Sequence, residues 1–225
     1  MKKNNNEKYL VEEHEPVVPK DGHLYRFIKR SFDIVASLLL MLILSPLILI
    51  LLLIKTLEDG HRPIYTSTRV GKNGREFKFH KIRSMFPNAE KYKKKLIKKG
   101  LNEADGPAFK MTNDPRVTKF GHFLRKSSLD ELPQLWDIFV GNMSFIGPRP
   151  PLPEEVKSYN SYQMHRLDVK GGLVCLWQTT SNRNSMPFDD WVALDIYYIE
   201  HRSVWFDIKI FFKALWFVVV DHTGV

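Results

Sequence analysis

Hydrophobic and polar positions divide the chain into one long apolar run near its N-terminus and a mixed remainder. Residues 34–54, "IVASLLLMLILSPLILILLLI", contain no charged side chain. A straight helix of that length rises about 1.5 Å per residue and would cross a hydrocarbon core of roughly 30 Å. The run therefore predicts a membrane helix, and its simplest form is a single span.

Two features favour a bent, re-entrant anchor over that span. Pro46 lies inside the run, where it removes a helical hydrogen bond, and the Ser45 hydroxyl beside it can satisfy the freed carbonyl. Basic residues flank both ends of the run, which favours keeping both flanks on the cytoplasmic side. We therefore expect a re-entrant helix over residues 26–56, bent at Ser45 and Pro46, after a flexible tail over residues 1–25.

A β-prone alternation follows the apolar run. The turn signal Lys72-Asn73-Gly74 separates two such runs, residues 64–70 and 76–84, and predicts a hairpin. Either the end of the second strand emerges into solvent, or it delivers positive charge into a pocket. The side chains that share one face of that strand are Phe77, Phe79, Lys81 and Arg83.

Helical patterns dominate the rest of the chain. Residues 88–100, "NAEKYKKKLIKKG", predict a basic helix that ends at Gly100. Its charged face is either solvated or rests on anionic lipid headgroups. Residues 205–225 mix aromatic side chains with two lysines, which suits either an interfacial helix or a buried core helix.

Composition narrows the kind of partner. A formal net charge of +9 points to an anionic partner: nucleic acid, a membrane surface or a phosphorylated small molecule. We do not expect nucleic acid, because the aromatic residues cluster near apolar segments and no nucleic-acid-binding module is recognisable. The single cysteine, Cys175, excludes an internal disulfide and a Cys-based zinc site, which indicates a reducing compartment.

The stretch "SSLDELP" carries the adjacent carboxylates Asp130 and Glu131. Ser128 and Glu131 match a capping box, which would start a helix and place both carboxylates at its positive dipole end. An ionised Asp130 could bind Mg²⁺ there or attack phosphorus directly. Arg125 and Arg149 could supply donors for phosphate oxygens. Capping and chemistry are compatible interpretations of the same residues.

Several stretches together resemble the monotopic bacterial phosphoglycosyl transferases, also called the bacterial sugar transferase family. They are "KRSFDIVASLLLMLILSP", "RVGKNGREFKFHKIRSM", "DPRVTKFGHFLRKSSLDELPQLWDIFVGNMSFIGPRP", "RLDVKGGLVCLWQTTSNRN" and "LDIYYIEHRSVWFDIKI". The resemblance implies an α+β, mainly helical catalytic domain over residues 57–225. Amphipathic helices would seat this domain, with the re-entrant helix, at the cytoplasmic face of the bacterial inner membrane.

The resemblance also implies an activity: transfer of a sugar 1-phosphate from a UDP-sugar to undecaprenyl phosphate, with release of UMP. Asp130 would be the nucleophile and would bind Mg²⁺, and Glu131 would position the metal or handle a proton. The transferred group would be a hexose 1-phosphate such as that of glucose or galactose. Whether the protein forms a homo-oligomer is left open. The expected contacts to phosphate, nucleotide or sugar are Lys81, Arg83, Arg125, Arg149 and Arg183.

The chain departs from the family pattern mostly on the expected sugar side. Gly171 stands where the family usually has Pro, and Cys175 and Asn182 stand for glycines. Asn142 stands for the Asp of "GDMS". We expect the compact form of the family, without a long N-terminal membrane domain. Two other hypotheses are open: a non-catalytic membrane adaptor of the same fold, and a basic membrane protein that binds nucleic acid.

Overall fold

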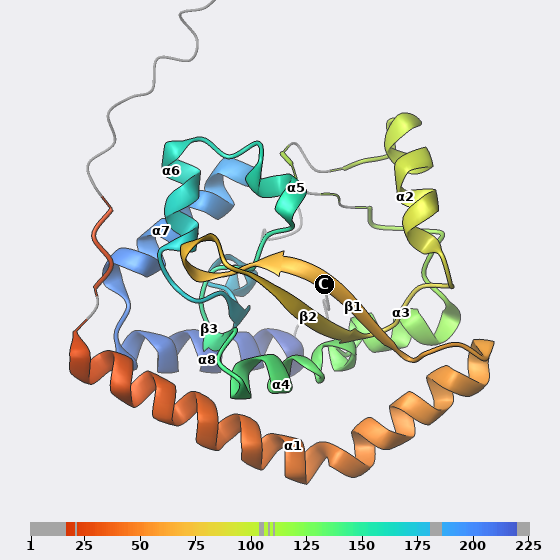
Figure 1. Ribbon diagram of the computed structural model, residues 1–225, viewed down its shortest axis with the longest axis horizontal. Coiled ribbons are helices and arrows are strands. Elements are labelled where there is room, and N and C mark those ends of the chain that lie inside the picture. The colour runs from red at the N-terminus through yellow and green to blue at the C-terminus, as the bar shows by residue number, and fades with distance from the viewer. Residues whose placement is uncertain are drawn as a thin grey trace, which may run out of the picture.

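The computed structural model describes residues 17–20, 22–103, 106–107, 109, 111–180 and 186–219, so most of the expected N-terminal tail lies outside it. The α-helices and strands follow in chain order: α1 (His23–Asp59), β1 (Ile64–Val70), β2 (Glu76–Ile82), α2 (Ala89–Lys98), α3 (Lys119–Lys126), α4 (Gln134–Phe139), β3 (Ser144–Ile146), α5 (Pro153–Val156), α6 (Ser161–Met164), β4 (Gly172–Val174), α7 (Phe188–His201) and α8 (Val204–Val219). The expected α+β, mainly helical fold is confirmed (Figure 1).

Helix α1 is continuous but bent, and both its ends lie on the side of the bend that carries the other elements (Figure 1). Pro46 lies inside it and has no N–H to donate to the Leu42 carbonyl. The Ser45 hydroxyl donates to that carbonyl at 2.8 Å, which confirms the role predicted for Ser45. Among the described residues, α1 is the one helix long and apolar enough to cross a membrane.

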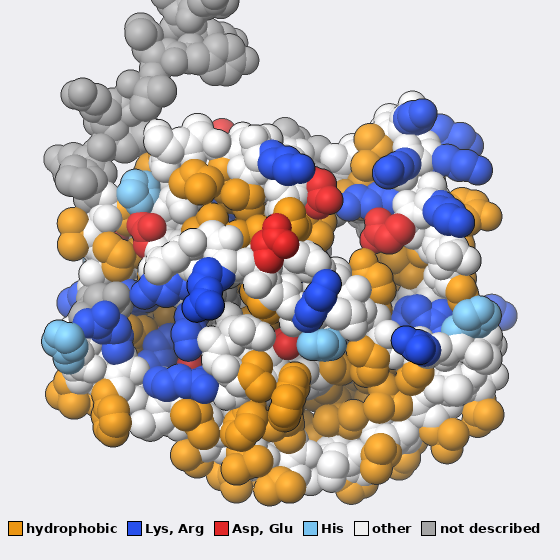
Figure 2. Space-filling model, in the orientation of Figure 1, with side chains coloured by type: hydrophobic (Ala, Val, Ile, Leu, Met, Phe, Trp, Pro, Cys, Tyr) orange, Lys and Arg blue, Asp and Glu red, His pale blue; other side chains and the backbone are white. Residues whose placement is uncertain are grey.

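The apolar side chains of α1 mostly face away from the rest of the protein and line the lower edge of the molecule (Figure 2). A few polar side chains on the opposite side hold the helix to the domain. Asp33 is 2% exposed and accepts hydrogen bonds from the Ser144 hydroxyl at 3.0 Å and the Phe145 amide at 3.1 Å. At the other end, Asp59 pairs with Arg83. Both arms of α1 are therefore tied to the domain.

The predicted hairpin is confirmed: β1 and β2 pair antiparallel, from Ile64 opposite Ile82 to Val70 opposite Glu76. Asn73 and Gly74 adopt the positive φ values, 57° and 74°, that the turn signal predicted. A second, parallel pair joins β3 to β4. Helix α4 packs against both α1 and β2, so it lies between the long helix and the hairpin.

The main core is formed largely by side chains of α4, β3, α7 and α8, and a smaller cluster joins Leu124 of α3 to Leu51 and Ile82. The indole rings of Trp177 and Trp191 stack in the main core with centroids 4.7 Å apart.

The basic helix α2 forms as predicted, with Gly100 at positive φ after its end, and it lies away from the bend of α1 (Figure 1). This position favours a solvated face. Helix α8 is partly core and partly surface, because Ile210 is 1% exposed and Trp205 is 65% exposed.

Candidate active site

The stretch with the two carboxylates does not form the predicted capping box. Leu129–Glu131 is a short 3₁₀ turn, and Ser128 has a φ of 55° with no capping hydrogen bond from its side chain. An N-cap residue needs extended backbone, which this left-handed conformation excludes. Helix α4 begins only after Pro133, so the two carboxylates lie before the helix rather than in its first turn. The predicted capping box is therefore wrong, and what begins after Ser128 is a single 3₁₀ turn rather than an α-helix.

The carboxylates are organised instead by Lys81 of β2. Its ammonium lies 2.7 Å from Glu131 Oε1 and 3.6 Å from Asp130 Oδ2. The Asp130 side chain is 8% exposed, whereas those of Glu131 and Lys81 are 24% and 28% exposed. The end of β2 thus delivers positive charge into a partly buried site, which is the second of the two interpretations that the sequence left open.

A buried contact between α4 and β2 positions Lys81. The Asp137 carboxylate accepts a hydrogen bond from the His80 amide at 3.0 Å and lies 2.8 Å from His80 Nδ1. Burial raises the pKa of Asp137, and its hydrogen bonds to His80 oppose that rise. Because His80 precedes Lys81, this contact fixes the strand immediately beside the site.

Arg125 of α3 lies on another side of Asp130. Helix α3 approaches the chain after β2 so closely that a Cβ on Gly121 would lie 1.8 Å from the Ser84 carbonyl oxygen. This approach lets Arg125 Nε donate to Ser84 Oγ at 2.9 Å. Burial lowers the pKa of Arg125, and the negative charge of Asp130 opposes that effect. Arg125 therefore adds positive charge to the site.

Arg149 is exposed, and the described part of the protein gives its guanidinium no hydrogen-bond or ion-pair partner. It lies close enough to Arg125 for its charge to lower the pKa of that residue. A free guanidinium beside a second cation is suited to bind an anion. The structure thus brings Lys81, Arg125 and Arg149 together around Asp130 and Glu131.

Arg69 of β1 belongs to the same positive region, although the sequence analysis did not assign it to the site. Its guanidinium lies 5.1 Å from the centre of the Phe79 ring, and Nη1 donates to the Pro150 carbonyl at 3.0 Å. Burial, followed by repulsion from Arg149, lowers the pKa of Arg69 to about 10. The pairing of Arg69 with Phe77 across the hairpin places it on the face that carries Lys81, and the strand register would have revealed this.

Two other predicted residues lie differently. Arg83 donates to both carboxylate oxygens of Asp59, at 2.9 and 2.6 Å, and to the Arg62 carbonyl at 2.9 Å. These contacts direct it to the end of α1 rather than to Asp130. Arg183 and the departure at Asn182 lie outside the described residues.

The donor set fits a magnesium ion that is shared with a substrate. Among the described residues, no three His, Cys, Asp or Glu side chains come together as a metal site. Mg²⁺, however, is commonly held by one or two carboxylates together with substrate phosphates and water. Asp130 and Glu131 supply such a pair, and the nearby cations could hold the phosphates.

Comparison with known proteins finds one family that covers most of the chain. The profile of a family described as bacterial sugar transferase matches residues 24–221, which include both arms of α1, the hairpin and the carboxylate pair. The match therefore covers all the elements that build the site.

Individual relatives are similar over most of this chain. A galactosyl transferase, CpsE, of Streptococcus agalactiae is 43% identical over 87% of the chain and 43% of the relative. The undecaprenyl-phosphate galactose phosphotransferase of Salmonella typhimurium is 42% identical over 84% of the chain and 40% of the relative. The exopolysaccharide production protein ExoY of Rhizobium meliloti is 37% identical over 92% of the chain and 90% of the relative. The chain thus spans less than half the length of the first two and most of the third.

Replacing Asp130 by Asn is expected to stabilise the protein more as the pH rises. Burial raises the pKa of Asp130, and the positive charge of Lys81 is the main effect that opposes this rise. Between the ordinary and the raised pKa, the folded protein therefore keeps a proton that the unfolded chain has lost. As the pH increases from the ordinary pKa of about 3.9 to the raised one, the free energy of unfolding falls by about 1.4 kcal/mol for each pH unit. Asparagine does not ionise, so the variant does not lose this free energy of unfolding as the pH rises.

The measurement is the unfolding temperature of the wild type and of Asp130→Asn from about pH 4 to about pH 8. Asp190→Asn is the matched control, because Asp190 is exposed on α7. A stability difference for Asp130→Asn that stays constant with pH would contradict the burial argument.

Proposed function

The chain belongs to the bacterial sugar transferase family, and on that basis we propose that it transfers a sugar 1-phosphate from a UDP-sugar to undecaprenyl phosphate. The products would be undecaprenyl-diphosphate-sugar and UMP. The observation that carries the proposal is the buried Asp130 carboxylate, 3.6 Å from the Lys81 ammonium and beside cations suited to phosphate. Because the names of two of the relatives refer to galactose or a galactosyl group, UDP-galactose is the first donor to test.

The proposed reaction has two displacements at one phosphorus atom. In the first, an Asp130 oxygen attacks the phosphorus that carries the sugar, and the bond from that phosphorus to the bridging oxygen breaks to release UMP. In the second, a phosphate oxygen of undecaprenyl phosphate attacks the same phosphorus and displaces the Asp130 carboxylate. The two steps together leave the enzyme as it began, and the sugar–phosphate bond is kept.

The environment of Asp130 suits this role. A carboxylate without strong hydrogen-bond donors on both oxygens keeps a lone pair for attack, and the 3.6 Å contact to Lys81 is a loose one. Glu131 holds the Lys81 ammonium at 2.7 Å and so keeps it beside the attacking group. Arg125 and Arg149 would bind the phosphates and stabilise the charge that develops on UMP.

Asp130 and Glu131 would also hold Mg²⁺ when the substrate is bound. The ion would neutralise phosphate charge and so lower the cost of bringing an anionic carboxylate to an anionic diphosphate.

We further propose that α1 enters one leaflet of the cytoplasmic membrane and returns. Its bend, its exposed apolar side chains and the location of both ends on one side support this placement. The domain would then lie at the cytoplasmic face, where a water-soluble UDP-sugar and a lipid phosphate can meet. The amphipathic helix α8, with its exposed Trp205, would lie at the same interface.

Asp130→Asn is expected to lower turnover by roughly four orders of magnitude or more, because it removes the nucleophile. Glu131→Gln, the control at the neighbouring carboxylate, should lower turnover by about 10²- to 10⁴-fold and keep the nucleophile. UMP release from UDP-galactose with undecaprenyl phosphate and Mg²⁺ measures the rate. Without the lipid acceptor, intact-protein mass spectrometry should find a hexose phosphate on the wild type and none on Asp130→Asn.

Full activity of Asp130→Asn would rule out this residue as the nucleophile. Absence of turnover by the wild type with every UDP-sugar of a broad panel would favour the membrane adaptor instead.

Arg149→Gln is expected to weaken substrate use without harming the fold, since the guanidinium is exposed and has no partner in the described part of the protein. Loss of a charged hydrogen bond to phosphate should lower kcat/KM by about 10- to 100-fold. Arg83→Gln is the matched comparison, because Arg83 pairs with Asp59. It should lower the unfolding temperature more than Arg149→Gln does, and steady-state kinetics with thermal unfolding distinguish the two patterns.

Cysteines placed at the two ends of α1 should be labelled from the same side of the membrane. Cys175 is 1% exposed and should give little background. A Cβ at Gly22 meets no atom within 4 Å, and Arg62 is exposed, so Gly22→Cys and Arg62→Cys should both react with an impermeant maleimide from the cytoplasmic side only. Leu47→Cys, inside the apolar run, should stay protected. Labelling of the two ends from opposite sides would restore the single span.

A further inference from the structure

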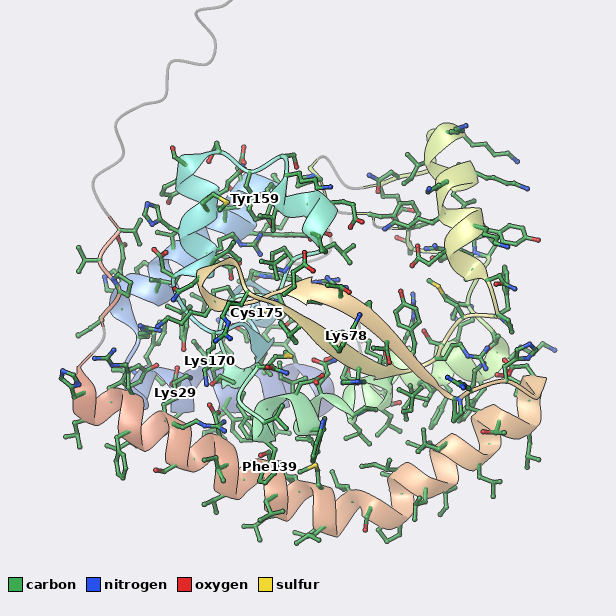
Figure 3. All side chains as sticks on the ribbon, in the orientation of Figure 1. Lys29, Lys78, Phe139, Tyr159, Lys170 and Cys175 are labelled. Atoms are coloured by element: carbon green, nitrogen blue, oxygen red, sulfur yellow. The ribbon has the colours of Figure 1, made fainter. Side chains whose placement is uncertain are left out.

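A second group of cations lies beside the first arm of α1, apart from the carboxylate pair. Figure 2 shows Lys and Arg side chains gathered above this arm, and Figure 3 places Lys29 and Lys170 there. The group includes Arg30 of α1, Lys170 just before β4 and Lys72 in the hairpin turn, all of them half-buried. The positive charges of Arg30 and Lys72 both lie close enough to Lys170 to lower its pKa. These residues come from three separate parts of the sequence.

The chain after α4 brings two of these charges together. Gly141 has a φ of +91°, and a Cβ on it would lie 3.1 Å from Arg30 Nη2 and 3.4 Å from Lys170 Nζ. Arg30 itself is held in place, because it donates to the carbonyls of Ile138 at 2.8 Å and Phe139 at 2.7 Å. Two cationic nitrogen atoms therefore face the same small volume over a glycine.

Neighbouring Lys29 shows what a structurally paired cation looks like here. Its ammonium lies 2.7 Å from Asp207 Oδ2 and 3.3 Å from the Tyr198 hydroxyl. Lys170 and Lys72 have no such partner among the described residues. The nearby carboxylate of Asp33 favours the charged form of Lys170, but its Oδ1 already accepts two hydrogen bonds. Positive charge at this place thus exceeds negative charge.

We propose that Arg30, Lys72 and Lys170 form a binding site for the phosphate group of an anionic phospholipid. The proposal rests on the membrane placement of α1 proposed above. The site lies where α1 meets the domain, and Leu24 and Phe27, each 71% exposed, precede Arg30 in the same arm of α1. A phospholipid can bind both surfaces at once, since its acyl chains cover the apolar arm of α1 and its phosphate contacts the cations. A free phosphate can contact only the cations.

The double variant Lys72→Gln/Lys170→Gln tests the site, and Arg30 is kept because it also holds the end of α4. The control is Lys94→Gln/Lys98→Gln on α2, which removes the same charge from exposed positions away from the bend of α1. The full chain in detergent micelles is titrated with phosphatidylglycerol or phosphatidylcholine, and native mass spectrometry measures the bound lipid. Thermal unfolding checks that both variants fold.

The wild type and the α2 control should bind phosphatidylglycerol more tightly than phosphatidylcholine, and the double variant should lose on the order of tenfold of that preference. Equal binding of the two lipids by the wild type, or an equal loss in the α2 variant, would overturn the proposal. Displacement of phosphatidylglycerol by millimolar inorganic phosphate would assign the site to free anions instead. Turnover by Asp130 is measured separately, so failure of the proposed activity and failure of this site are distinguishable.

Discussion

The position of strand β2 is the constraint on which the rest of the structure depends. Two residues near its end are fixed by different elements: His80 by Asp137 of α4, and Arg83, just past the strand end, by Asp59 at the end of α1. Lys81 lies between these two contacts, which hold its ammonium beside the carboxylates of Asp130 and Glu131. Because α1 is the apolar helix, the same strand connects the proposed membrane anchor to the proposed nucleophile. The proposed anchor and the proposed active site therefore share one rigid element.

This arrangement places a carboxylate where its own burial disfavours its charge. The cations around Asp130 offset part of that cost, and they are the groups that an incoming diphosphate would need. Arg69 and Arg125 contribute to the same field, although burial lowers the pKa of each. A site with surplus positive charge and one buried carboxylate is poorly optimised for stability and well suited to hold an anion. The proposed function accounts for these residues, which packing alone would not select.

Local features of the sequence predicted what depends on local physics. Pro46 removes a hydrogen bond wherever it lies in a helix, so the irregularity in α1 and the compensating role of Ser45 could be foreseen. The capping box could not be judged locally, because Ser128 takes a left-handed backbone between α3 and the 3₁₀ turn. The partner of Arg83 lies at the end of α1, and Arg69 enters the site only through the hairpin register. Such contacts join residues far apart in the sequence, so they can be identified only once the fold is known.

The Pro-Arg-Pro loop shows how the fold prepares a free guanidinium. Four successive carbonyls of residues 148–151 accept hydrogen bonds from Gly172 N, Arg166 Nη2, Arg69 Nη1 and Val70 N. Gly171 packs against the same loop, since a Cβ there would lie 2.4 Å from Pro150 Cγ. The backbone of Arg149 is therefore held from two sides while its side chain has no partner in the described structure. Binding of a substrate phosphate to Arg149 would therefore cost little free energy for ordering the loop, because the folded protein has already ordered it.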